Sequence, residues 1–220
     1  MTLSKEQTIE IVLRLVNSYG LKKKGSLFVI TNNSKIFSNY ETLYPDLFSN
    51  KYINIERREV QTLLNYLSDM DGAIILKEDG LIIDYGAKIK QTEVLLGHGT
   101  RHSAALGISK LKDCMAILSS EEDGKVRIFK DGVLTIELDP TTGKKLKLIT
   151  KIAHLLSRKE LQIATSGGLA SLFIGLNPLV AGIIFTGSYV ITKFGMGSIK
   201  EFIETGEIAV KEIRNTTEGK

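Results

Sequence analysis

Two Asp-Gly pairs, each set between two short hydrophobic runs, constrain the fold of this chain most strongly. The runs AIIL and LIID flank Asp79-Gly80, and the sequence KVRIFKDGVLTIEL places Asp131-Gly132 in the same arrangement. Asp-Gly between apolar runs is a strong hairpin signal, because both residues tolerate the positive φ angles of tight turns. The sequence therefore predicts two β-hairpins.

Helical and strand-like segments alternate around these hairpins. Residues 4–19 carry apolar side chains at helical spacing, with Ser4 as the expected N-cap and Gly20 as the expected stop. Helical spacing returns in residues 57–70 and 102–111, and the short runs SLFVIT and CMAILSS predict buried strands. This alternation predicts the α/β class, with a single mixed β-sheet domain flanked by helices.

The composition is that of a folded protein. Of 220 residues, 43% are hydrophobic and 25% are charged, which is enough apolar material for one core and an extension. The single cysteine, Cys114, excludes an intrachain disulfide, and no cysteine cluster indicates structural zinc. We expect a reducing compartment, because no signal-peptide pattern opens the chain.

A basic run and a long uncharged run follow the α/β region. Residues 144–159 carry six cations and no acid, and residues 161–192 contain no charged residue. About 20 apolar residues can cross a bilayer, and glycine is common in membrane helices. Three interpretations stay open: a kinked membrane span, a helical hairpin lodged in the membrane, and a buried oligomerisation hairpin. We expect membrane association through this hydrophobic helical segment or hairpin, with the preceding cations and the α/β domain on the cytoplasmic side.

The net charge of +4 is a weak indication of anionic partners. Most of the basic character is explained by the run at residues 144–159. The sequence contains no helix-turn-helix pattern and no interleaved aromatic and basic stripe. Nucleic-acid binding is therefore not expected.

Two short motifs at strand ends could hold a phosphate or a metal. Asp71 with Gly72 and Ala73 stands before the AIIL run, where a carboxylate could ligate Mg²⁺ and the small residues let a ligand approach the backbone. Ser120 ends the run CMAILSS and Glu121 follows it directly. Ser120 could contact a phosphate, and Glu121 could ligate a metal. Taken alone, each motif fits an ordinary turn equally well or better.

The sequence GHGTRHS at residues 97–103 has the composition of a phosphate cradle. Its glycines let backbone N–H groups point at an anion, Thr100 adds a hydroxyl, and Arg101 adds a planar fork suited to phosphate oxygens. A helix starting near His102 or Ser103 would add unpaired N–H groups and the positive end of its dipole. A surface arginine and a capping serine are the plain alternative. Two histidines four apart do not predict zinc here, because a glycine lies between them.

Together and in this order, these motifs resemble the diadenylate cyclase (DAC) domain family. That family's signatures, Asp-Gly-Ala, Gly-Thr-Arg-His-Arg-Ala-Ala and Ser-Glu-Glu, are matched by residues 71–73, 99–105 and 120–122. The resemblance extends over about residues 24–138, including KGSLFVIT as the first strand and IIDYGAKI as the second strand with its adenine-contacting turn. One position departs from the family: Ser103 replaces a second arginine that would help to bind or orient the nucleotide.

The resemblance implies an enzyme that condenses two ATP molecules into cyclic di-AMP and releases two pyrophosphates. Each domain would bind one ATP and face a second domain in a homo-oligomer, and a Mg²⁺ or Mn²⁺ ion would assist. The implied parts are an N-terminal amphipathic helix (1–21), a catalytic domain (22–143), and a C-terminal part (144–220) with a basic linker helix, the uncharged segment and a polar tail. Because of the serine that replaces an arginine, a catalytically weakened sensor of ATP or cyclic di-AMP at a membrane is the alternative.

The resemblance also assigns roles to individual residues. The implied catalytic residues are Asp71, Gly72, Ala73, Thr100, Arg101 and His102. The implied nucleotide-binding residues are Tyr85, Gly86, Ala87, Ile89, Gly99, Ser103 and Ser120. The implied metal ligands are Asp71 and Glu121.

Overall fold

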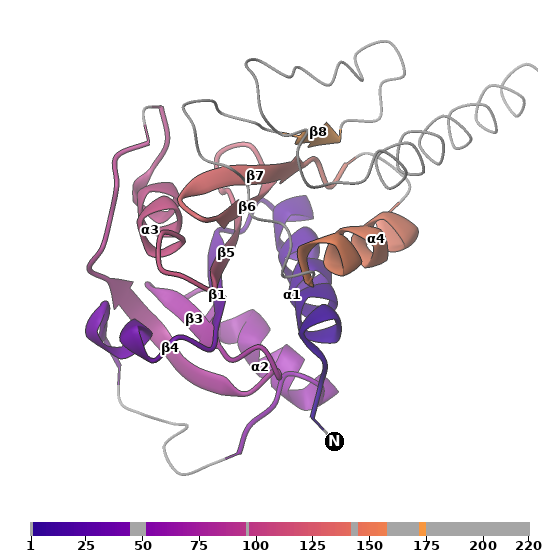
Figure 1. Cartoon of the computed structure of the whole chain (residues 1–220). Helices are drawn as coiled ribbons and strands as arrows, with labels where there is room; N and C mark the ends of the chain where they lie inside the picture. Colours follow the sequence, from indigo (N-terminus) through magenta and orange to yellow (C-terminus); the bar gives the residue numbers. More distant parts are fainter. Residues whose placement is uncertain (1, 45–51, 96, 142–144, 158–171, 175–220) are drawn as a thin grey trace, which may run out of the picture.

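The computed structural model describes residues 2–44, 52–95, 97–141, 145–157 and 172–174, which form one β-sheet with helices on both faces (Figure 1). The helices are α1 (Lys5–Leu21), the 3₁₀ helix η1 (Ser34–Ser38), α2 (Arg58–Leu67), α3 (Thr100–Ile108) and α4 (Lys145–Ser157). The strands are β1 (Ser26–Thr31), β2 (Tyr40–Thr42), β3 (Ala73–Leu76), β4 (Ile82–Ile89), β5 (Cys114–Ser119), β6 (Val126–Lys130), β7 (Val133–Leu138) and β8 (Leu172–Ile174).

The sheet is mixed, as the sequence predicts. Its strand order in the described residues is β2-β4-β3-β1-β5-β6-β7-β8. β1 pairs with β3 in parallel, β7 pairs with β8 in parallel, and the other neighbours are antiparallel. Both predicted hairpins are confirmed: β3–β4 turns at Gly80 with φ +85°, and β6–β7 turns at Asp131 and Gly132 with φ of 53° and 74°.

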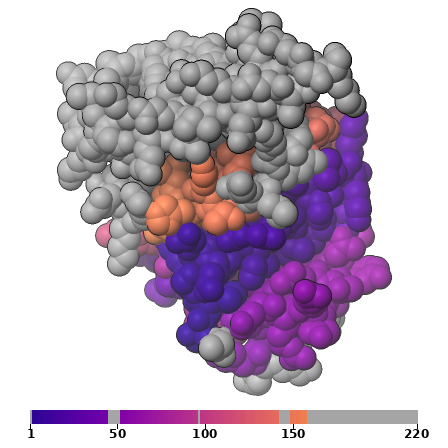
Figure 2. Space-filling model, turned by 90° about the vertical axis from the view of Figure 1, so that its right-hand side faces the viewer, coloured from indigo at the N-terminus to yellow at the C-terminus, as the bar shows by residue number. Residues whose placement is uncertain are grey.

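Both faces of the sheet are covered, which gives two hydrophobic clusters. Along β1, Phe28 and Ile30 pack with α1, α2 and α4, whereas Leu27 and Val29 pack with α3 on the opposite face. Figure 2 shows α4 (orange) lying directly beside α1 (indigo) on the first face. A strand buried on both sides has no need of polar alternation, which explains why SLFVIT is almost continuously apolar.

The N-terminal end of α1 matches the sequence prediction, and its C-terminal end does not. Ser4 is the N-cap, and its Oγ accepts from the Gln7 backbone N–H at 3.2 Å while Gln7 Oε1 accepts from the Ser4 N–H at 2.8 Å. The expected stop at Gly20 is wrong, since the helix continues to Leu21. Gly20 instead allows close packing: a Cβ there would overlap with the Gly124 carbonyl oxygen.

α3 begins earlier than the sequence predicts. Gly99 is the N-cap and Thr100 the first helical residue, so Arg101 and His102 lie inside the first turn rather than before it. The backbone N–H groups of His102 and Ser103 both donate to the Gly99 carbonyl, at 3.2 and 3.3 Å. These bonds close the first turn at the glycine, and the helix therefore starts there.

The uncharged segment lies outside the described residues except for Leu172–Ile174. These three residues form β8, with Leu172 paired to Ile136 of β7, where the sequence predicts a helix. The edge of β7 offers unpaired backbone groups, which an extended segment can satisfy. Within the part of the chain that the structure describes, no helix has the length and apolar character needed to cross a bilayer.

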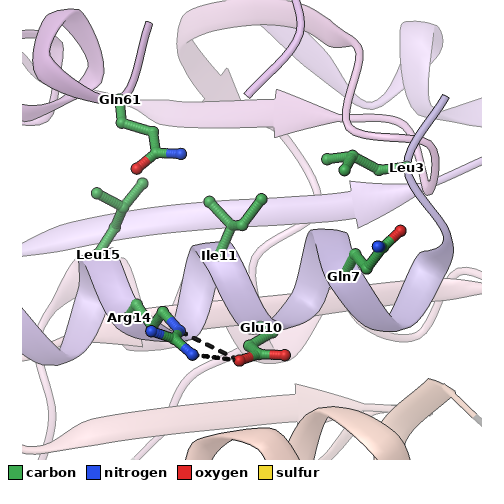
Figure 3. Close-up of a pocket in the computed structure, with 7 residues that line it drawn as sticks. All are labelled: Leu3, Gln7, Glu10, Ile11, Arg14, Leu15 and Gln61. Atoms are coloured by element: carbon green, nitrogen blue, oxygen red, sulfur yellow. Dashed lines mark hydrogen bonds and ion pairs between the residues drawn. The ribbon is translucent and has the colours of Figure 1, made fainter. Parts of the chain in front are cut away.

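A groove of about 410 Å³ runs along the outer side of α1 (Figure 3). The Glu10–Arg14 ion pair lies along it, as the dashed lines in Figure 3 mark. The groove contains none of the residues to which the DAC resemblance assigns a role. The lining residues are Leu3, Gln7, Glu10, Ile11, Arg14, Leu15 and Gln61.

Candidate functional site

The ends of several strands meet at one edge of the sheet and bring distant motifs together. β1 and β3 begin there, and β5 ends there, because Ser26 pairs with Ser119 across the β1–β5 ladder. The parallel β1–β3 register pairs Phe28 with Ile74. Continued three residues toward the N-terminus, this register sets Gly25 level with Asp71. The edge therefore carries the Asp-Gly-Ala motif on one side of β1 and the Ser-Glu-Glu motif on the other.

The first turn of α3 reaches the same edge. The Arg101 guanidinium donates to the Glu121 carboxylate, and both side chains lie over Gly25. A Cβ at Gly25 would overlap with Arg101 Nη1 and would lie 2.5 Å from Glu121 Oε1. Two motifs that are separate in sequence thus meet over one glycine, at the edge that also carries the third motif. Arg101 keeps 30% of its side chain exposed, so its charge stays accessible to a ligand.

Asp71 is held at the start of β3 by the backbone that follows it. Gly72 has φ +98° and lies so close to the neighbouring strand that a Cβ would be 2.7 Å from the Ala87 nitrogen. Asp71 itself is exposed, and among the described residues no side chain pairs with it. Its carboxylate is therefore free to meet a ligand at the sheet edge.

Lys24 holds the loop that carries Asp71 in place, although no motif in the sequence includes it. Its Nζ pairs with Asp69 at 2.8 Å, donates to the Asn65 carbonyl, and lies 5.2 Å from the centre of the Tyr19 ring. Its side chain is only 17% exposed. These contacts connect Lys24, the residue before Gly25, to Asn65 in α2 and to Asp69, which lies two residues before Asp71. No sequence signal reports this, because the partners are about 40 residues away.

His102 is buried beneath this edge and does not resemble an exposed phosphate ligand. Its side chain is 4% exposed, and its Nε2 lies 3.0 Å from Nη1 of Arg127. Burial, with smaller contributions from the nearby Arg127 and His98, lowers the pKa of His102 to about 4, and the opposing effects of Asp123 and Glu137 are weaker. His102 is therefore neutral at pH 7, and Arg101 is the cation of this turn.

A pH dependence of stability follows from the buried histidine. Between pH 6.5 and about 4 the unfolded chain binds a proton at His102 that the folded chain does not bind. The free energy of unfolding should thus fall as the pH is lowered through this window, by roughly 1–3 kcal/mol. Urea unfolding at a series of pH values measures it. His102→Gln should flatten the slope, and His98→Gln, which changes an exposed ring, should leave most of it.

Ser120 closes the turn between β5 and β6. Its side chain is 3% exposed, its N–H donates to the Lys125 carbonyl at 2.9 Å, and its Oγ lies 3.5 Å from the Asp123 backbone nitrogen. Burial raises the pKa of Asp123, but hydrogen bonds from Arg127 and the Lys125 N–H lower it far more, so Asp123 stays ionised. The turn that presents Glu121 is therefore well ordered.

The turn expected to contact adenine is covered by a tyrosine that belongs to no sequence motif. Tyr85 is 2% exposed, and Gly86, with φ +58°, has the ring of Tyr44 against it. The rings of Tyr44 and Tyr85 are nearly parallel, 6° apart, with centres at 6.1 Å. The neighbouring Ala87 and Ile89 are also buried. Tyr44 is thus the aromatic group on the outer side of this turn, and it stands in an Asn- and Tyr-rich stretch without a motif.

The carboxylates at the edge suit a divalent cation of the Mg²⁺ type. Asp71 and Glu121 offer hard oxygen ligands, and Glu121 shares its carboxylate with Arg101. In the described ranges, no group of three or more His, Cys, Asp or Glu side chains could hold a metal by itself. Mg²⁺ commonly takes one or two carboxylates and completes its shell with water and substrate phosphates. The residues present fit that mode of binding.

Comparison with known protein families identifies the family of this chain. Residues 16–134 match the family described as DisA bacterial checkpoint controller nucleotide-binding (DAC), which is more than half of the 220 residues. The chain belongs to the DAC family. The family resemblance expected from the motifs is confirmed.

Two curated relatives agree with this assignment. The chain is 29% identical over 143 residues to the diadenylate cyclase of Methanocaldococcus jannaschii, covering 61% of this chain and 46% of that protein. It is 28% identical over 148 residues to the cyclic di-AMP synthase CdaA of Bacillus subtilis, covering 65% and 52% respectively. A crystal structure of a double mutant of DacA from Staphylococcus aureus matches with a TM-score of 0.49 and 21% identity, over 69% of this chain and 94% of that one. The chain spans about half the length of the curated relatives it matches.

Proposed function

We propose that this chain is a diadenylate cyclase that condenses two ATP molecules into cyclic di-AMP and releases two pyrophosphates. One observation carries the proposal: in a chain of the DAC family, Arg101 and Glu121 pair over Gly25, at the same sheet edge where Asp71 precedes β3. The arrangement offers an exposed carboxylate beside an accessible guanidinium. These are the groups that a nucleotidyl transfer requires.

The proposed reaction consists of two equivalent transfers. In each, the 3′-hydroxyl of one ATP attacks the α-phosphorus of the other, the bond from that phosphorus to the bridging oxygen breaks, and pyrophosphate leaves. Asp71 would assist removal of the hydroxyl proton, a contribution worth roughly 10²–10⁴-fold for a well-placed base. Arg101 would leave Glu121 in part to bind phosphate oxygens and stabilise the charge that develops on them.

A Mg²⁺ or Mn²⁺ ion would be held by Asp71 and Glu121 together with the phosphates. When bound, such an ion neutralises phosphate charge and makes the attacking hydroxyl more acidic. The protein's own part is to hold the two carboxylates at one edge. Gly25 makes room for one of them and Gly72 aims the other.

Two chains must face each other for both transfers to occur, so we propose a homo-oligomer. Holding two reactants in the correct orientation can contribute roughly 7–11 kcal/mol in favourable cases. We also propose that the uncharged segment, residues 161–192, associates with a membrane and raises the effective concentration of the second active half on the cytoplasmic side.

The direct test is to incubate the purified protein with ATP and Mg²⁺ or Mn²⁺ and to resolve the products by chromatography. Cyclic di-AMP with two equivalents of pyrophosphate supports the proposal. ATP that is bound but unchanged would favour the alternative, a sensor of ATP or cyclic di-AMP. Ser103, where the family usually has an arginine, is the observation behind that alternative. In that case Ser103→Arg is the next variant to assay.

Specific activity should fall when the protein is diluted, because two chains build each productive pair. Initial rates measured over a hundredfold range of protein concentration should rise more steeply than the concentration itself at the dilute end. Added lipid vesicles should reduce this dependence if residues 161–192 bind a membrane. A rate that is strictly proportional to concentration down to the nanomolar range would contradict a dissociable pair.

Gly25→Ala should lower activity with little loss of stability. The atoms nearest to the new Cβ, Arg101 Nη1 and Glu121 Oε1 and Cγ, belong to two side chains and not to backbone, and partly exposed side chains can rotate aside. Their displacement should reduce turnover by about 10²-fold, since a misplacement of 1 Å can cost that much. Rates and thermal unfolding of the same preparations measure the two effects. Gly132→Ala is the control: its Cβ would also meet a flexible side chain, that of Lys110, but in the β6–β7 turn away from this edge, so the variant should keep its activity although the positive φ of this position costs stability.

A further inference from the structure

Arg127 of β6 joins three elements beneath the candidate site. It is 3% exposed. Its Nε donates to Glu137 of β7 at 2.7 Å, its Nη1 and Nη2 both donate to Asp123 in the β5–β6 turn, and Nη1 also lies 3.0 Å from His102 Nε2 in α3. Arg127 and Glu137 are direct partners in the β6–β7 register. The guanidinium is therefore fixed on several sides.

The contact determines the protonation of the histidine. A guanidinium can only donate, because it has no acceptor and does not lose its proton in proteins. His102 Nε2 must therefore accept, which leaves the single proton of the neutral ring on Nδ1. The groups that face this ring are His98, Arg127, Asp123 and Glu137. The low pKa of His102 agrees with a neutral ring.

The charges around Arg127 balance only when it is present. Glu137 is 7% exposed and accepts from both Arg127 and Lys125, the latter at 2.7 Å, and Asp123 pairs with Arg127 alone among the described side chains. Two cations thus match two carboxylates. Without Arg127, one carboxylate would be left uncompensated beside His102 and would favour the imidazolium form.

We infer that Arg127 is a positioning residue, which fixes His102 as the neutral Nδ1–H imidazole and thereby holds the first turn of α3 against the β5–β6 turn. Arg101 precedes His102 directly, and Glu121 stands two residues before Asp123. Arg127 therefore controls the position of Arg101 relative to Glu121, although Arg127 itself does not touch a ligand. Its effect on turnover rests on the proposed function, whereas its effect on the His102 ring does not.

The histidine ring can be tested without any assay of activity. The chain has three histidines, at positions 98, 102 and 154, and the two exposed ones can be assigned with His98→Gln and His154→Gln. Long-range ¹H–¹⁵N correlation spectra of the full chain should show His102 protonated on Nδ1, with no titration between pH 5 and 8. A proton on Nε2, or a midpoint within that range, would overturn the inference.

Variants of Arg127 test the positioning role. Arg127→Gln should bring a His102 titration into the range of pH 5–8 and reduce kcat by about 10²-fold with a smaller change in KM. Arg127→Lys keeps the charge and should restore a non-titrating ring and part of the activity. Arg14→Gln, which removes an exposed arginine of α1, is the matched control. If Arg127→Gln fails to fold, Arg127→Gln with Asp123→Asn is measured in its place, because it removes the carboxylate that loses its ion-pair partner, whereas Glu137 keeps Lys125.

The outcomes separate the two proposals. Loss of activity in Arg127→Gln without a new titration of His102 would mean that Arg127 acts through stability alone, and the inference would be wrong. If the native chain makes no cyclic di-AMP, the ring of His102 should still respond to Arg127→Gln as described. That pair of results would overturn the proposed cyclase and support the role of Arg127 in fixing the imidazole.

Discussion

Asp71→Asn is expected to reduce the formation of cyclic di-AMP by about 10²–10⁴-fold, the range for loss of a well-placed catalytic carboxylate. Asparagine has nearly the same shape but cannot accept a proton and is a poor ligand for Mg²⁺. Asp71 is exposed and no described side chain pairs with it, so the substitution should leave folding unchanged. Initial rates of cyclic di-AMP and pyrophosphate release measure the loss.

Asp113→Asn is the matched control for Asp71→Asn. Asp113 is an exposed aspartate just before β5, at the opposite end of that strand from Glu121, and has φ +58°. Asparagine tolerates this backbone conformation. The control should keep full activity. An Asp71→Asn protein that makes cyclic di-AMP at the native rate would remove Asp71 from the proposed chemistry, whatever the other residues do.

Gly72→Ala is expected to lower the free energy of unfolding by about 2–5 kcal/mol. A side chain at φ +98° carries a backbone cost of roughly 1–2 kcal/mol, and overpacking adds roughly 1–3 kcal/mol. The overlap here is with the backbone of Gly86 and Ala87, which cannot swing aside as a side chain can. Urea unfolding of the two proteins measures the difference in the free energy of unfolding.

Gly97→Ala separates the two contributions. Gly97 also has positive φ, +79°, but a Cβ there would have no atom within 4 Å among the described residues. It should therefore lose only the backbone part, about 1–2 kcal/mol. Equal losses in the two variants would show that the contact of Gly72 with β4 does not contribute.

Local signals predicted most of the elements correctly. The two hairpins follow from Asp-Gly turns whose φ angles few other residues tolerate, and Ser4 caps α1 because its hydroxyl and Gln7 satisfy backbone groups within one turn. These features depend on neighbours within a few residues. The sequence predicts the start of α3 two residues too late, because a glycine at the N-cap looks in sequence like a break in the helix.

Contacts between distant segments were beyond such signals. Lys24 pairs with Asp69, and Tyr44 covers Gly86. No local sequence pattern around Lys24 or Tyr44 predicts these partners. Gly20 looked like a helix stop because glycine usually ends helices, yet it serves the close approach of the Gly124 backbone. The same residue type fits several local roles, and only the packing selects one.

The sequence by itself determined the type of domain and the functional side chains that are present, since hydrophobic periodicity, turn residues and the order of the three motifs are properties of the chain. Only the tertiary structure decided how the motifs are used. The strand register brings Asp71 level with Gly25, and the fold sets Arg101 against Glu121 and buries His102 against Arg127. Burial and long-range pairing are what set the charge of a side chain, and neither can be read from residues that are far apart in sequence.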